Sequence, residues 1–96
     1  MDQRKNDISS AARVGQRLAL TREAHDWKQV YVAKAVGLAS ASGWANYESG
    51  INLIPIIYAL RFCAISGVDP NWIYHGKMEG LPHHLALKIQ DLMKAS

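Results

Sequence analysis

Four histidines and one cysteine are the side chains that would most readily serve catalysis or metal binding. None of the histidines (His25, His75, His83 and His84) has a cysteine or carboxylate at a metal-ligand spacing, and the adjacent pair would point about 100° apart on a helix. Cys63 has no second cysteine to pair with, and its simplest interpretation is a small core side chain. The sequence also lacks a glycine-rich phosphate loop and a local nucleophile motif. We therefore expect no enzymatic activity, no metal and no cofactor.

Uncharged hydrogen-bonding side chains form a second group, which begins at residue 40. Ser42 and Asn46 are four residues apart, so on a helix they would share one face, with Ser40 and Ala41 at its start. Asparagine can bond the N6 and N7 edge of adenine, serine can bond most bases, and alanine can contact a thymine methyl group. The chemistry available here is recognition of base edges from the outward face of a helix.

Two short helices joined by a tight turn are predicted to position these side chains. The first begins at residue 29 and stops at Gly37, because glycine tolerates the left-handed backbone that ends many helices. The second runs from about residue 40 to 49, with Trp44 and Tyr47 inward, and is closed by Gly50. Helices this short need neighbours to be stable. Such a pair commonly holds its second helix in the major groove of DNA.

An ordered series of residues along the chain is typical of one family. In the first helix of the pair, a Gln, an Ala and a Gly are spaced four residues apart. The second helix ends in an aromatic residue, Glu, any residue and Gly. After it comes a helix that begins with Pro, then a Gly-Val turn, an Asp-x-x-Trp sequence and a final Gly. These residues are Gln29, Ala33, Gly37, Tyr47-Glu48-Ser49-Gly50, Pro55, Gly67-Val68, Asp69, Trp72 and Gly76. On them the chain resembles the phage-repressor-like (Cro/CI, XRE) helix-turn-helix family over residues 12–77. The resemblance implies an all-α, compact five-helix lambda-repressor-like domain and a sequence-specific DNA-binding transcriptional regulator, most often a repressor.

The resemblance also implies roles for individual side chains. Gln29 would bond a phosphate or brace the recognition helix, and Lys28, at or near the cap of the same helix, would contact a phosphate. Asn52 lies in the loop where related repressors place groups that contact the DNA backbone. The family's Glu, here Glu48, pairs with an Arg seven residues before the motif Gln, which is Arg22. We expect these two to form a partly buried ion pair that fixes the recognition helix.

The turn of the motif departs from the family pattern. One more residue than usual separates Gly37 from Ala45, so Ala39, Ser40 or Ala41 can be the helix cap. A serine hydroxyl can accept a hydrogen bond from an unpaired amide at the start of a helix. We therefore expect Ser40 at the cap and Ala41 and Ser42 as the first outward residues.

Charge is the second departure. From residue 38 to 54 the only side chain charged at neutral pH is Glu48, so no Arg or Lys can bind guanine there. Residues 1–36 hold seven basic and four acidic side chains, which suits a phosphate backbone and equally a solvated surface. We expect affinity to come from phosphate contacts and from a homodimer. An adaptor that pairs proteins and has little DNA affinity remains the alternative.

The rest of the chain divides into three parts. Residues 1–8 are expected to be a flexible arm in which Arg4 and Lys5 could reach DNA. The helix-turn-helix domain would occupy residues 9–77, with its first helix capped by Ser9 or Ser10. The apolar helix of residues 55–66 is expected in the middle of the fold, because most of its circumference is apolar. Residues 78–96 would form an additional C-terminal helix with a possible role in dimerisation.

Length and composition limit the number of domains and the class of protein. Ninety-six residues that are 49% apolar and 20% charged are typical of one globular domain. No apolar run approaches the ~20 residues of a membrane span, and no secretory signal is evident. We expect a cytoplasmic, nucleoid-associated protein whose partners are double-stranded DNA and a second copy of itself. The sequence points to no small-molecule ligand and no membrane.

Overall fold

The computed structural model describes residues 7–95, and over this range the chain is all-α. Its helices are α1 (Ala11–Ala24), α2 (Gln29–Val36), α3 (Ala41–Glu48), α4 (Ile56–Ser66), α5 (Pro70–His75) and α6 (His83–Ala95). Each helix expected from the sequence is present. Within these residues, no helix combines the length and apolar character needed to cross a membrane.

Local signals in the sequence set the helix ends. Ser10 caps α1, where its hydroxyl accepts a hydrogen bond from the amide of Arg13 at 3.3 Å. Asp69 caps α5 in the same way, with its carboxylate 2.9 Å from the Trp72 amide. Gly37 ends α2 with φ +89°, in the left-handed region that glycine adopts without strain. The structure thus confirms Ser10 as the cap of α1 and Gly37 as the end of α2.

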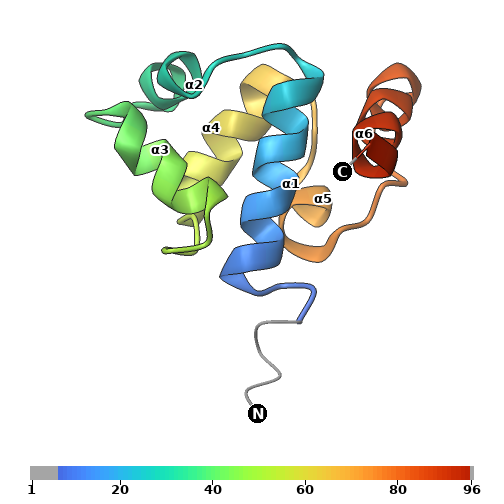
Figure 1. Ribbon diagram of the computed structural model, residues 1–96, viewed down its shortest axis with the longest axis horizontal. Coiled ribbons are helices and arrows are strands. Elements are labelled where there is room, and N and C mark those ends of the chain that lie inside the picture. The colour runs from blue at the N-terminus through green and yellow to red at the C-terminus, as the bar shows by residue number, and fades with distance from the viewer. Residues whose placement is uncertain (1–6, 96) are drawn as a thin grey trace.

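Helix α1 stands at the centre of the arrangement (Figure 1). It contacts α3 on one side, α6 on the other, and α5 behind, while α2 contacts both α3 and α4. The inner stripe of α1 consists of Val14, Leu18, Thr21 and Ala24, which are all buried. Trp72 of α5 reaches this stripe and donates its indole N–H to the Thr21 hydroxyl at 2.9 Å.

The expectation that α4 lies in the middle of the fold is wrong. Its Ala59 and Phe62 are buried, but large apolar side chains on its other side are open to solvent. Together with two residues of the preceding loop, these form what we call the α4 patch. The patch consists of Ile51, Leu53, Ile56, Ile57 and Leu60, which are 50–69% exposed. An apolar circumference places a helix centrally only when neighbours surround it. Helix α4 contacts α2 and α5 and packs Phe62 against Trp44 of α3, while its other side is uncovered among the described residues.

The two ends of the described chain both contact α1. Leu85 and Ile89 of α6 are buried within the monomer, whereas Leu87 and Met93 stay about half exposed. Of the expected arm, residues 1–6 lie outside the described part. The carbonyl of Ile8 accepts a hydrogen bond from the Arg17 guanidinium, so the chain is joined to α1 before the helix begins.

Candidate nucleic-acid interface

Helix α3 lies against α1 with backbone touching backbone. The close approach occurs at Gly15, in the middle of α1. A Cβ atom built on Gly15 would be 2.4 Å from the carbonyl oxygen of Glu48 and 2.5 Å from that of Tyr47. Only glycine therefore allows the last turn of α3 to sit at this distance from α1.

Arg22 and Glu48, which were expected to pair, hold the same end of α3. Arg22 donates from Nε to Glu48 Oε2 at 2.6 Å and from Nη2 to Oε1 at 3.0 Å. The side chains are 15% and 7% exposed, and the hydrogen bond with Glu48 raises the pKa of Arg22. A third guanidinium N–H bonds the carbonyl of Trp27 at 2.9 Å, in the loop before α2. A bidentate pair of this kind is both strong and directional.

Two further donors converge on Glu48. Gln29 at the start of α2 donates from Nε2 to Oε1 at 2.9 Å, and Trp44 within α3 donates its indole N–H to Oε2. We call this set of Arg22, Gln29, Trp44 and Glu48 the Glu48 hub. It joins α1, α2 and α3 through one carboxylate. Of the two roles expected for Gln29, bracing the second helix is the one that its contact shows.

The opposite side of α3 carries the residues expected to meet bases. Ser40 is the N-cap residue, as expected, but its hydroxyl bonds that of Ser42 at 2.8 Å and not a backbone amide. Ser40 and Ser42 are exposed, and Ala41 and Asn46 are partly exposed. Because α3 begins at Ala41, the longer turn is absorbed before the helix. The side-chain amide of Asn46 has no hydrogen-bond partner among residues 7–95.

Cationic and polar groups flank α3. Lys28 is the exposed N-cap residue of α2, and Asn52 is exposed in the loop after α3. Arg61, which the sequence did not suggest, reaches from α4 to the end of α2 and donates to the carbonyl of Val36 at 3.0 Å. Its guanidinium also lies 5.7 Å from the centre of the Tyr58 ring. No local signal could have found Arg61, because its contact spans two helices distant in sequence.

Cys63 and His25, two of the reactive groups noted in the sequence, are both partly buried. Burial raises the pKa of the Cys63 thiol to about 11, which leaves it protonated and poorly nucleophilic at neutral pH. His25 stacks on Trp27 with ring centres 4.2 Å apart, and its Nε2 lies 2.8 Å from the carbonyl of Ser66. Within residues 7–95, no three His, Cys, Asp or Glu side chains are grouped so as to hold a metal ion.

Comparison of the chain with family models, curated proteins and solved structures yields no match. The distinctive feature of this chain is the helix α3, whose inner side and C-terminal end are held by α1 and α2. The outer side of that helix carries short polar side chains.

Proposed function

We propose that the chain is a sequence-specific DNA-binding transcriptional regulator, a repressor of the phage-repressor-like helix-turn-helix class, with α3 entering the major groove. The Glu48 hub carries this proposal. It joins α2 and α3 into one rigid unit with α1, while Ser42 and Asn46 face outward. A helix that reads bases must keep its side chains in a fixed position relative to the DNA backbone.

In the proposed complex, recognition and affinity come from different groups. Asn46, Ser42 and Ala41 would contact base edges, because amide, hydroxyl and methyl groups suit adenine, any base and thymine respectively. Lys28, Asn52 and Ser40 would contact phosphates at the rim. Since α3 itself has no cation, the salt-dependent part of the affinity would come from Lys28 together with other basic side chains of residues 1–36.

Selection of bound sequences from a random DNA pool, followed by titration at two salt concentrations, tests this proposal. We expect Asn46→Ala to weaken binding to the selected sequence by about 1–3 kcal/mol, with little effect on unselected DNA. Lys28→Gln should weaken binding to both and reduce the salt slope by about one. Absence of binding at low salt to the whole pool would contradict DNA binding.

A protein-pairing adaptor is the second candidate, and the α4 patch is the observation that favours it. If the chain fails to bind the pool yet self-associates through this patch, the adaptor is the better assignment. A steep salt dependence together with a selected sequence supports the regulator.

We propose that a second copy of the chain covers the α4 patch. The patch begins directly after α3 and contains no charge, so a two-fold axis through it would bring two identical apolar surfaces together beside the two recognition helices. Every member of the patch is at least half exposed, but five residues are far fewer than the about 20–30 residues a side of a standard interface. Stable dimers bury about 800 Å² per partner, so we expect a weak dimer that DNA strengthens, with half-sites about 34 Å apart or a multiple of it.

Ile57→Asp tests this dimer. The side chain is 52% exposed, so the change should leave the monomer folded while it lowers self-association in sedimentation equilibrium by at least about tenfold. Leu87→Asp is the matched control, because Leu87 is 48% exposed on α6. We expect it to leave self-association unchanged. Dissociation by Leu87→Asp and not by Ile57→Asp would show that α6 pairs the two copies.

A further inference from the structure

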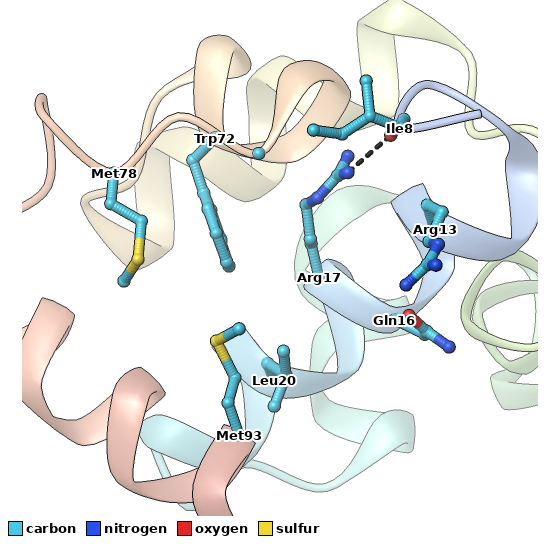
Figure 2. Close-up of a pocket in the computed structure, with 9 residues that line it drawn as sticks. Ile8, Arg13, Gln16, Arg17, Leu20, Trp72, Met78 and Met93 are labelled. Atoms are coloured by element: carbon cyan, nitrogen blue, oxygen red, sulfur yellow. Dashed lines mark hydrogen bonds between the residues drawn. The ribbon is translucent and has the colours of Figure 1, made fainter. Parts of the chain in front are cut away.

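A groove between α1 and α6 lies on the far side of α1 from α3. It encloses about 360 Å³, and Figure 2 shows Leu20, Trp72, Met78 and Met93 around the open space. A second hollow of about 400 Å³ adjoins it, because Gln16, Leu20 and Met93 line both. Volumes of this size are in the range of small-molecule sites.

One end of the groove is cationic. Arg13 and Arg17 line it there, one turn apart on α1 (Figure 2). Arg17 is buried and donates to the carbonyls of Ile73, at 3.0 Å, and Ile8. Both partners are neutral, and within residues 7–95 no carboxylate pairs with either guanidinium. Buried charges are normally paired with an opposite charge, so this end of the groove has an uncompensated positive charge.

The groups around Arg17 do not compensate its positive charge. Burial and the charge of Arg13 both lower the pKa of Arg17, and no acidic group of residues 7–95 offsets them. Gly76 lines the groove beside the guanidinium, where an added Cβ would lie 3.1 Å from Nε and Nη2. The guanidinium therefore packs directly against the Gly76 backbone, and any side chain at this position would crowd it.

The other end differs in chemistry. Beyond Leu20 and Met93 the adjoining hollow is lined by Ala19 and ends at Glu23. From Arg13 to Glu23 the groove follows α1 for about 15 Å, at 1.5 Å per residue. The carboxylate of Glu23 would repel an anion, so a ligand with one acidic end and an apolar body has a single favourable direction. Methionine side chains suit such a body, because they adapt to its shape.

We propose that this groove binds an amphipathic anion, with its acidic head at Arg13 and Arg17 and its apolar tail along Leu20, Met78 and Met93. Gln16 lies beside the head position and can donate a further hydrogen bond. A ligand seated there contacts both α1 and α6 and would strengthen their packing. The site is separate from the outward face of α3, and the proposal stands whether or not the chain binds DNA.

Decanoate is the probe, used below its micelle-forming concentration with the full chain and no DNA. The chain has methionines at positions 1, 78 and 93, so methyl-labelled methionine gives NMR signals at two groove positions, assigned through Met78→Leu and Met93→Leu. We expect decanoate to shift both signals saturably. Octanoate should bind about tenfold more weakly, since each CH₂ contributes about 0.8 kcal/mol. Decyl phosphate should also bind and would distinguish a phosphate head from a carboxylate head by its relative affinity.

The role of charge in binding is tested by removing it first from the ligand and then from the groove. Decanol has the same tail and no charge, and we expect at least tenfold weaker binding. Arg13→Gln should weaken decanoate binding by about tenfold, because Arg13 is exposed and its loss removes charge without unfolding α1. Lys34→Gln removes an exposed cation on α2, and we expect its decanoate affinity to stay within twofold of that of the unchanged chain. Equal binding of decanol and decanoate, or unmoved Met78 and Met93 signals, would overturn the proposal.

Discussion

Replacing Glu48 with alanine is expected to lower the free energy of unfolding by about 3–5 kcal/mol, the largest effect of any single change proposed for this chain. The variant would leave the mostly buried Arg22 without its charged partner. It would also leave the indole N–H of Trp44 and the amide of Gln29 without the acceptor they now share. Urea denaturation followed by circular dichroism measures the loss, which at about 4–8 °C per kcal/mol should also appear in the melting temperature.

Glu23 provides the matched control, because its carboxylate also approaches Arg22, at 3.7 Å, but its side chain is 49% exposed. We expect Glu23→Ala to cost less than about 1 kcal/mol, as surface ion pairs usually do. The double variant Arg22→Met/Glu48→Leu should be more stable than either Arg22→Met or Glu48→Ala alone, since it removes both charges together. A Glu48→Ala variant as stable as Glu23→Ala would show that the Glu48 hub does not hold the fold.

Gly15→Ala is expected to destabilise the chain by at least about 2 kcal/mol, although alanine is ordinarily the better helix former. The new methyl group would meet the carbonyl oxygens of Tyr47 and Glu48 at 2.5 and 2.4 Å. These are backbone atoms, which cannot rotate away as a side chain would. The last turn of α3 would have to move off α1, so the same variant should also weaken any binding that α3 performs.

Gly43→Ala is the control for this second change. Gly43 lies within α3, and its nearest contact for an added Cβ is Leu38 Cδ1 at 3.7 Å, an ordinary van der Waals distance. We expect it to stabilise the chain by up to about 1 kcal/mol, the usual gain from Gly to Ala in a helix. The two substitutions are chemically identical and should have opposite signs in the same unfolding experiment. Stabilisation by both would mean that α1 and α3 are not in close contact in solution.

The helices and their ends were predictable because their causes are local. Ser10 and the Asp69-Pro70 pair cap helices through atoms only a few residues away, and Gly37 ends α2 through its own backbone conformation. These features depend on residues within one or two turns, so a linear pattern contains the necessary information.

The candidate site was only partly predictable. The pairing of Arg22 with Glu48 was predicted from the family resemblance. Trp44 lies four residues before Glu48, so its indole could have been expected to bond the same carboxylate. Arg61 had no such signal. The exposure of the α4 patch was missed because hydropathy shows that a surface is apolar and does not show whether another element covers it. Coverage depends on how distant helices pack.

Backbone contact at Gly15 has a consequence for selectivity. A helix fixed against α1 along its last turn cannot tilt or slide to accommodate a different base sequence. In the proposed complex, the DNA would therefore have to change its shape to fit α3. Base-pair steps that kink easily, or that easily narrow a groove, would be favoured even where no side chain contacts them. Bound sequences should then share flexibility at positions outside the direct contacts of Ser42 and Asn46.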